Sequence, residues 1–339
     1  MKEQSKRFQL FLPVYFLIFL TAFGCTACRS GSGKPVSKSA FMLNTVVTVT
    51  LYDSADETVI DGALELCKNY ENQLSMTLTD SEVSKMNHRL GGQSAFNVNE
   101  DFEELLEKAI YYSEITDGAF DITISPLSSL WDFSGSAPKV PSEDAIREIL
   151  PMVDYKNLRL ENHQLSFLSA DTQLDFGAIA KGFIADKMKE YLIGQGVKSA
   201  LINLGGNVLC IGTRPDQTPF KIGIQKPFKD RNEVVGSLNV SDMTVVSSGI
   251  YERNFTENGI LYHHLLDPKT GYPFDNGLIA VTILCEKSVD GDGLSTSCFA
   301  LGLEKGMELI NSLENAYAVF ITEEGTLFYS EGMEAFISE

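Results

Sequence analysis

The chain has 339 residues, of which 44% are hydrophobic and 22% are charged, so it can bury a large core in one or two domains. Its formal net charge of -19 argues against binding nucleic acid through the phosphate backbone. The acidic residues form no long run, and we interpret them as a solvated surface.

The N-terminal residues have the pattern of a signal peptide. Lys2, Lys6 and Arg7 form a basic start, and residues 8–23 are almost wholly apolar. This apolar run has about the length of a signal-peptide core and is short for a membrane-spanning helix. We therefore predict a lipoprotein-type signal peptide over residues 1–24, and an uncleaved anchor is the alternative.

The residues around the first two cysteines indicate how the protein is anchored. The small residues Ala22 and Gly24 precede Cys25, with the bulky Phe23 between them, which resembles a bacterial lipobox, in which the cysteine is acylated and becomes the new N-terminus. We predict that Cys25 is lipidated, with Cys28 as the second choice. A redox pair of these two cysteines is disfavoured, because no strand precedes it and no helix follows. Residues 25–40 are predicted to be a flexible tether. A lipidated cysteine after a signal peptide would anchor the protein on the extracytoplasmic face of a bacterial cell membrane.

Hydrophobic periodicity and β-branched runs predict the elements of the first half of the chain. The expected elements are a strand over 42–52, helices over 56–74, 80–87 and 100–116, a short strand over 120–124, a helix over 142–150, and a hairpin formed by 155–160 and 164–168. Trp131 is expected in the core. Helices therefore dominate this half.

The second half is predicted to consist mostly of strands. The expected elements are a helix over 182–195, strands over 199–203, 207–211, 220–224, 236–240, 243–247, 259–265 and 278–285, a helix over 291–312, and strands over 316–322 and 327–330. Strands followed mainly by strands, with helices grouped between them, predict an α+β fold rather than a regular βαβ array.

Four further cysteines are widely spaced in apolar contexts: Cys67, Cys210, Cys285 and Cys298. Their spacing does not match a zinc site. We expect them to be small buried hydrophobic residues, and disulfide pairing after export is the alternative.

An acid and a hydroxyl in the predicted helix over 291–312 suggest a metal site. Asp292 and Thr296 lie four residues apart, so both side-chain oxygens project from one helix face. These oxygens suit Mg²⁺, which takes few protein ligands and keeps room for phosphate oxygens. The alternative is a carboxylate near a helix N-terminus beside an unrelated threonine.

The segment Leu174–Asp186 has features of a phosphate-binding turn. Gly177 allows a tight turn, and the helix that opens at Lys181 has N–H groups without partners, which can bind phosphate. Lys181 adds a positive charge. The P-loop pattern is absent, and a simple turn with a helix cap is the alternative.

Two further segments contain polar groups at turns. Of His263 and His264, one is expected to transfer a proton or to donate to phosphate, which we prefer to a structural zinc site. Asn203–Asn207 is either an anion-binding turn or a Gly-Gly hairpin.

Taken in order, these segments resemble the ApbE family of FAD:protein FMN transferases, from about Met42 to Gly302. The segments that carry the resemblance are residues 74–75 with 80–87, 116–123, 126 with 130–131, 174–186, 203–207, 247–253, 263–273 and 292–296. The resemblance implies an ApbE-like α+β domain over 41–335, with mostly antiparallel sheets, helices packed on them and an FAD cleft between two lobes.

The resemblance also implies an activity and its residues. Family members bind FAD and Mg²⁺ outside the cytoplasm and transfer FMN from FAD to a Thr or Ser hydroxyl of a partner protein, releasing AMP. By the family pattern, Asp292 and Thr296 hold Mg²⁺ through side-chain oxygens, and Ala178 adds its backbone carbonyl. The residues implied for the FAD site are Leu43, Ala119, Phe120, Asp121, Asp175, Lys181 and Leu265. The family's Met-Gly-Thr motif is Leu43-Asn44-Thr45 in this chain.

The expected mechanism is phosphoryl transfer to the partner's hydroxyl, with His264 as the proton acceptor and Asp292 as the alternative. FAD is then a substrate, Mg²⁺ the cofactor, and the acceptor a membrane-associated redox protein. One other function is a Mg²⁺-dependent FAD pyrophosphatase, in which water replaces the hydroxyl and the products are FMN and AMP. Another is a non-catalytic FAD-binding lipoprotein, against which the intact pair of Asp292 and Thr296 argues.

Overall fold

The structure is a computed structural model that describes residues 34–89, 93–135, 137–230 and 233–338. The described residues belong to one compact unit. The predicted signal peptide and the predicted lipidation site Cys25 lie outside these residues. Within the described ranges, no helix is both long enough and apolar enough to cross a bilayer.

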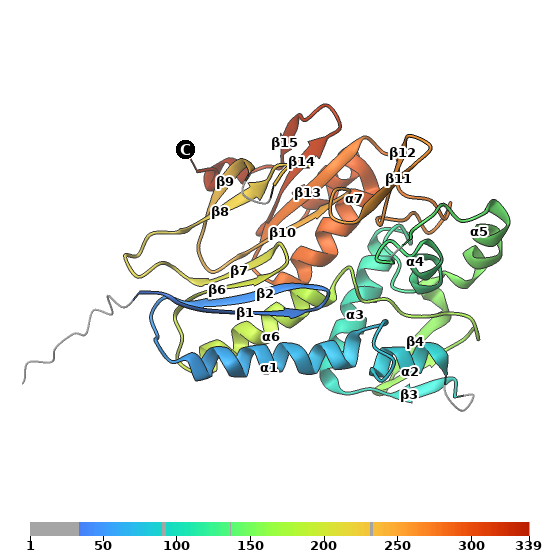
Figure 1. Cartoon of the computed structure of the whole chain (residues 1–339), viewed down its shortest axis with the longest axis horizontal. Helices are drawn as coiled ribbons and strands as arrows, with labels where there is room; N and C mark the ends of the chain where they lie inside the picture. Colours follow the sequence, from blue (N-terminus) through green and yellow to red (C-terminus); the bar gives the residue numbers. More distant parts are fainter. Residues whose placement is uncertain (1–33, 90–92, 136, 231–232, 339) are drawn as a thin grey trace, which may run out of the picture. The chain divides into compact units, whose positions relative to one another are not determined.

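An eight-stranded sheet forms the centre of the fold (Figure 1), and every pair of neighbouring strands in it is antiparallel. In spatial order the strands are β1 (Val36–Met42), β2 (Thr45–Leu51), β6 (Ser199–Leu204), β7 (Asn207–Gly212), β10 (Thr244–Gly249), β13 (Leu278–Cys285), β14 (Ala316–Thr322) and β15 (Leu327–Tyr329). This arrangement confirms the predicted α+β class.

Three long helices cover one face of the sheet: α1 (Glu57–Leu74), α6 (Ala180–Gly194) and α7 (Ser288–Asn311) (Figure 1). Their apolar faces pack on the sheet in the largest core cluster of the described residues. On α1, for example, Ile60, Cys67 and Leu74 are buried, at the spacing of one helical face. A second core joins the sheet to a hairpin of β8 (Phe220–Gln225) and β9 (Val234–Val240).

Shorter elements complete the fold. The helices are α2 (Glu82–His88), α3 (Glu100–Ile115), α4 (Ser125–Trp131) and α5 (Glu143–Ile149), and the 3₁₀ turns are η1 (Leu150–Met152), η2 (Tyr155–Asn157) and η3 (Met333–Phe336). The additional strands are β3 (Ala95–Asn97), β4 (Leu158–Glu161), β5 (Gln164–Phe167), β11 (Asn254–Glu257) and β12 (Ile260–His263). As predicted, Trp131 is fully buried, and its indole N–H donates to the Gly271 carbonyl over 2.8 Å.

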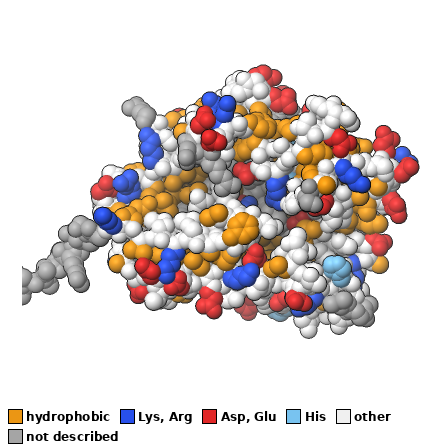
Figure 2. All heavy atoms as spheres, viewed as in Figure 1, with side chains coloured by type: hydrophobic (Ala, Val, Ile, Leu, Met, Phe, Trp, Pro, Cys, Tyr) orange, Lys and Arg blue, Asp and Glu red, His pale blue; other side chains and the backbone are white. Residues whose placement is uncertain are grey.

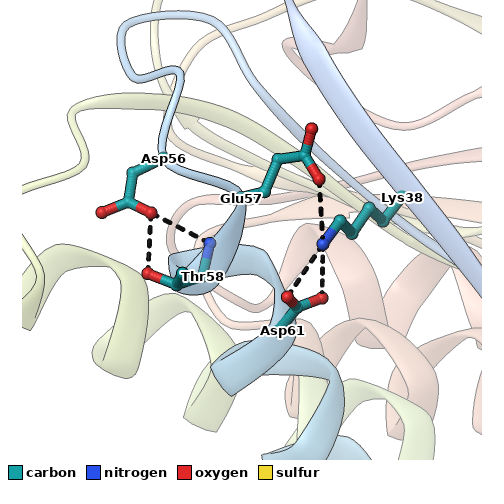
Figure 3. A network of polar contacts seen from close by, with 5 residues as sticks. All are labelled: Lys38, Asp56, Glu57, Thr58 and Asp61. Carbon is teal, nitrogen blue, oxygen red and sulfur yellow. Dashed lines mark hydrogen bonds and ion pairs between the residues drawn. The ribbon is translucent and has the colours of Figure 1, made fainter.

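Polar contacts fix the edge strand β1 on helix α1 (Figure 3). The Lys38 ammonium of β1 lies 2.7 Å from the nearer Asp61 oxygen and 3.1 Å from Glu57, both in the first turns of α1. Asp56 caps the helix, because its side chain accepts a hydrogen bond from the Thr58 N–H. These contacts hold the start of the domain against the helix layer.

The hairpin of β1 and β2 corrects two predictions. The single strand expected over 42–52 is wrong, because a two-residue turn at Leu43 and Asn44 divides it. Residues 36–40, predicted to be part of the tether, instead form most of β1. The sequence pattern concealed both, because the Leu-Asn turn contains no glycine and β1 (Val-Ser-Lys-Ser-Ala-Phe-Met) has one β-branched residue, unlike β2.

The strand predicted over 120–124 is also wrong. This segment is a turn in which the Asp121 carboxylate accepts hydrogen bonds from the N–H and hydroxyl of Thr123. Helix α4 then begins, with Pro126 in its first turn, where the missing N–H is tolerated. Strand β11 was not predicted, because its residues Asn-Phe-Thr-Glu carry little hydrophobic signal.

Cysteines and surface charge agree with the sequence-based predictions. Cys67, Cys210, Cys285 and Cys298 are free and buried, as expected of small hydrophobic residues. On the face shown in Figure 2, acidic and basic side chains are interspersed among polar and apolar ones. The acidity is therefore distributed over this face as solvated surface.

Candidate active site

The N-termini of α6 and α7 meet at the centre of the candidate site. A Cβ atom added at Gly182 would lie 2.0 Å from the Ser288 carbonyl oxygen, far inside van der Waals contact. Only a glycine allows the two helix ends to approach this closely. The contact brings the Leu174–Asp186 segment next to the helix that carries Asp292, as expected if both contribute to one site.

Each of these helices supplies a carboxylate that caps the other. Asp292 of α7 accepts a hydrogen bond from the Gly182 N–H over 2.5 Å, and Asp186 of α6 accepts from the N–H groups of Ser288 and Val289, each over 2.9 Å. Neither helix has a capping side chain at its own N-cap residue. Burial raises the pKa of Asp186 to about 6, and its two N–H donors oppose that rise.

Asp292 is held on its second oxygen by a residue from the sheet. The Asn207 side chain, at the start of β7, donates to Asp292 Oδ1 over 3.0 Å. Asp292 is only 3% exposed, and Asn207 is 2% exposed. Each carboxylate oxygen accepts one of these hydrogen bonds and keeps a lone pair for a further partner.

Thr296 lies one turn further along α7, on the same face as Asp292. Its hydroxyl is 3.3 Å from the Ser248 hydroxyl, at the end of β10. Ser248 also lies 2.8 Å from the hydroxyl of Ser295, which in turn donates to the Asp292 carbonyl over 3.0 Å. The end of β10 and the helix therefore present hydroxyls side by side.

The oxygen atoms of this site fit Mg²⁺. No described residue donates a hydrogen bond to the Ala178 carbonyl, because the Gly182 N–H is directed to Asp292 instead. A carboxylate, a hydroxyl and a free carbonyl are hard oxygen ligands of the kind Mg²⁺ takes in small number. Among the described residues, no three or more His, Cys, Asp or Glu side chains are grouped so that they could hold a metal.

Two cations without an acidic partner lie near His264. Lys181 and Arg253 form no ion pair with any described residue, and both of their charges act on His264. The Lys181 N–H likewise meets no acceptor among the residues described. In a chain of net charge -19, these two unpaired cations and the Lys181 N–H suit a phosphate ligand.

The two histidines differ in their contacts. His264 Nδ1 lies 3.2 Å from the Arg253 carbonyl, and since a carbonyl only accepts, Nδ1 carries the proton and Nε2 keeps its lone pair. Burial, aided by the charge of Arg253, lowers the pKa of His264 to about 3. His263 instead donates from Nε2 to the Phe274 carbonyl, and its buried Nδ1 meets no described partner.

The predicted FAD-site acids support the loops on which they lie. The Asp121 carboxylate, 9% exposed, also accepts from the Tyr155 N–H over 3.0 Å, and burial raises its pKa. Asp175 accepts from the Gly177 N–H over 2.8 Å and from the Ser128 hydroxyl over 2.9 Å. The Asp175 N–H donates to the Ile122 carbonyl, so these two predicted segments lie next to each other.

The turn between β1 and β2 reaches the same region through the β6–β7 turn. A Cβ added at Gly205 would lie 2.2 Å from the Thr45 hydroxyl, so the two turns are in contact. Gly205 and Gly206 both have positive φ and join paired strands, which confirms the hairpin interpretation of Asn203–Asn207. Leu43 is half-buried in its turn, and its N–H donates to Glu71 over 2.7 Å.

The remaining predicted FAD residues are mostly buried. Phe120 is 3% exposed and Leu265 is 8% exposed, while Ala119 is half-buried. The Leu265 carbonyl accepts from the Phe274 N–H over 3.0 Å. Their role as flavin contacts stays a prediction.

The sequence did not indicate that Asn207 and Ser248 lie beside Asp292 and Thr296. Both lie in segments that were singled out from the sequence. A sequence does not indicate, however, that an amide at the end of a strand faces a carboxylate on a helix. The helix spacing of Asp292 and Thr296 was the readable signal. The partners from β7 and β10 depend on tertiary packing.

Comparisons with known proteins identify the family. Residues 43–321 match the model of the ApbE family. An FAD:protein FMN transferase from Klebsiella pneumoniae (strain 342) is 38% identical over 296 residues, which are 87% of this chain and 91% of that protein. Another from Treponema pallidum (strain Nichols) is 31% identical over 334 residues, which are 91% of this chain and 92% of that protein.

Solved structures show the same fold. The crystal structure of the ApbE protein from Thermotoga maritima superposes with a TM-score of 0.82 at 30% identity, covering 90% of this chain and all of that one. The flavin transferase ApbE from Vibrio cholerae superposes with a TM-score of 0.80 at 26% identity, covering 89% of this chain and 99% of that one. Fold, site and relatives together define a transferase enzyme. The chain belongs to the ApbE family.

Proposed function

We propose that this protein transfers FMN from FAD to a Thr or Ser hydroxyl of a partner protein in a Mg²⁺-dependent reaction that releases AMP. The observation that carries the proposal is the convergence of Asp292, Thr296 and the N-terminus of α6, on a chain whose curated relatives are FAD:protein FMN transferases. An acid–hydroxyl pair beside the unpaired Lys181 N–H suits a pyrophosphate with its cation.

Asp292, Thr296 and the Ala178 carbonyl are the groups that would hold Mg²⁺. When bound, the ion supplies charge neutralisation at the phosphate oxygens and polarises the phosphorus for attack. Lys181 and the free N–H at the start of α6 bind and orient the phosphates of FAD. Arg253, which is exposed, extends this positive surface toward solvent.

The proposed transfer step is an in-line displacement at the FMN phosphorus. The acceptor hydroxyl oxygen forms the new P–O bond, the P–O bond to the bridging oxygen breaks, and AMP leaves with that oxygen. His264 Nε2 has the lone pair that takes the hydroxyl proton, with Asp292 as the alternative acceptor. A histidine pKa of about 3 makes His264 a weak base that is neutral at physiological pH, so it accepts a proton only as the bond forms.

We also propose that the protein is a lipoprotein, anchored through Cys25 on the extracytoplasmic face of a bacterial membrane, and that its acceptor is a membrane-associated redox protein. The support is the signal-peptide pattern and the small residues before Cys25. Metabolic labelling with a fatty acid should mark the wild-type chain, and Cys25→Ala should remove the label. If the label persists in Cys25→Ala but is lost in Cys28→Ala, the lipidated residue is Cys28 instead.

The transfer activity is tested with the full chain in detergent, FAD, Mg²⁺ and an acceptor domain that has one candidate threonine. Flavin fluorescence on a denaturing gel reports the covalent product. We expect a fluorescent acceptor band that requires Mg²⁺ and disappears in Asp292→Ala and when the acceptor threonine is changed to alanine. A control with Ser330→Ala, a buried hydroxyl bonded to the Ala318 N–H in the C-terminal strands, should keep the band.

The same assay separates the other functions. AMP released without a fluorescent band on any acceptor tested would favour hydrolysis of FAD by water. FAD that stays bound and intact would favour a flavin-binding lipoprotein.

A further inference from the structure

A row of buried polar groups leads from the sheet to the Asp292 carboxylate. Thr244 of β10 lies 3.1 Å from the Ser288 hydroxyl, Ser288 donates to Asn207 Oδ1 over 2.8 Å, and Asn207 Nδ2 donates to Asp292 Oδ1 over 3.0 Å. Thr244 and Ser288 are fully buried, and the other two are at most 3% exposed. Buried polar groups in such a row are costly unless each is satisfied.

The row has a fixed direction. The Asp292 carboxylate only accepts, so the Asn207 amide turns its NH₂ to Asp292, and the amide oxygen then accepts the Ser288 proton. Thr244 has one proton, which it gives to Ser288 or to the Val208 carbonyl 3.2 Å away. Ser288 therefore supports this orientation of the Asn207 amide by donating to its oxygen.

The orientation matters because the flipped amide would place an oxygen against a carboxylate. With its NH₂ toward Asp292, Asn207 fixes the position of Oδ1, while the Gly182 N–H fixes Oδ2. Both donors leave lone pairs on the carboxylate for a cation. Groups that orient metal ligands in this way commonly alter metal affinity when they are removed.

We propose that Asn207 is a positioning residue for the cation ligand Asp292, and that Ser288 acts on Asp292 through Asn207. The inference rests on the proposed Mg²⁺-dependent function and adds to it two residues that do not themselves touch substrate or cation. A positioning role differs from a purely structural one, because removing either side chain should lower the cation affinity more than it lowers the free energy of unfolding.

The test is a titration of the full chain in detergent with Mn²⁺ in the presence of FAD, in which the electron paramagnetic resonance signal reports free Mn²⁺. We expect Asn207→Ala to weaken Mn²⁺ binding by about 10- to 100-fold. Ser288→Ala should weaken it less, because the amide remains but loses its orienting donor. Ser330→Ala, a buried hydroxyl outside the row, should bind Mn²⁺ like the wild type.

A double substitution tests whether Ser288 acts through Asn207. If it does, Asn207→Ala with Ser288→Ala should bind Mn²⁺ no more weakly than Asn207→Ala alone. Independent effects that add would overturn the proposed relay. In the transfer assay, Asn207→Ala should raise the Mg²⁺ concentration needed for half-maximal rate, with kcat at saturating Mg²⁺ changed only a few-fold.

The outcomes separate this inference from the proposed function. A wild-type chain that binds no Mn²⁺ with FAD would overturn the proposed cation site itself. A wild type that binds Mn²⁺, with Asn207→Ala and Ser288→Ala binding equally well, would overturn the positioning role alone. Urea unfolding of each variant shows whether Asn207→Ala is misfolded. If it is, Ser288→Ala, which removes only a hydroxyl, decides whether the positioning role holds.

Discussion

Substitution of Thr296 tests how much its hydroxyl contributes to flavin transfer. Thr296→Val keeps the shape of the side chain and removes the oxygen, so we expect kcat/KM for flavin transfer to fall by about 10- to 100-fold, the value of a hydrogen bond or ligand to a charged group. Steady-state transfer rates at fixed Mg²⁺ measure this effect. The loss should shrink as Mg²⁺ is raised.

The neighbouring Ser297 is the matched control for Thr296. Its hydroxyl is buried, and no described residue forms a hydrogen bond with it. Ser297→Ala on the same helix should therefore keep the transfer rate and leave stability equal or slightly higher. Equal rate losses in Thr296→Val and Ser297→Ala would show that helix packing, rather than the Thr296 oxygen, governs the rate.

His263 makes a pH-dependent contribution to stability. Burial lowers its pKa from 6.5 to about 4, so between these values the unfolded chain binds a proton that the folded chain does not. The free energy of unfolding should fall as the pH decreases from 7 to 5, by about 2 kcal/mol from this residue alone. His263→Gln, which keeps a donor for the Phe274 carbonyl, should show a correspondingly weaker pH dependence in urea unfolding at the two pH values. An unchanged pH dependence would show that His263 does not cause the loss of stability at low pH.

At the scale of elements, the close approach of α6 and α7 depends on Gly182. In Gly182→Ala the new methyl group meets the Ser288 carbonyl, so we expect a loss of about 1–3 kcal/mol in the free energy of unfolding, the usual cost of overpacking. The helix ends must separate, and the Gly182 N–H then leaves Asp292. Transfer activity should fall more than stability alone explains.

Gly194, at the other end of α6, provides the comparison. A Cβ there has nothing within 4 Å, and the substitution to alanine should stabilise the helix by up to about 1 kcal/mol. Chemical unfolding and transfer rates of the two alanine variants measure the difference. Similar behaviour of Gly182→Ala and Gly194→Ala would rule out the tight helix contact.

The β1–β2 turn explains how the chain departs from the family's Met-Gly-Thr motif. Leu43 and Asn44 both have φ of 55°, the left-handed conformation of a two-residue type I′ hairpin turn. Asn tolerates this conformation better than most residues, so Asn44 can replace a glycine. Leu43 is less suited to it, and its N–H bond to Glu71 helps to hold it there.

At the scale of the whole molecule, local patterns predicted most elements but not their junctions. Helices with caps and long apolar stripes, such as α1 behind Asp56, were predicted to within a residue or two. The β1–β2 turn was missed, because Leu-Asn lacks the glycine that usually marks such a turn. Helix α4 was missed, because a strand was predicted over 120–124 and Pro126 is not typical of a helix interior, although it is tolerated in the first turn, where it lies.

The candidate site was predictable where its residues share one element. Asp292 and Thr296 follow from helix spacing, and Lys181 from its place at a helix start. Asn207 and Ser248 come from strands far away in sequence, and only the antiparallel order β7-β10-β13 with α7 packed on it brings them to Asp292 and Thr296. Long-range packing of this kind leaves no local periodic signal.

The central claim is that the flavin of FAD ends on a protein hydroxyl. The most direct measurement is the ratio of AMP released to flavin attached to the acceptor, followed by mass spectrometry in a single reaction with wild-type chain and Mg²⁺. We expect one AMP per attached flavin, with both products lost together in Asp292→Ala. AMP formed in large excess over attached flavin, or attachment that survives in Asp292→Ala, would contradict the account.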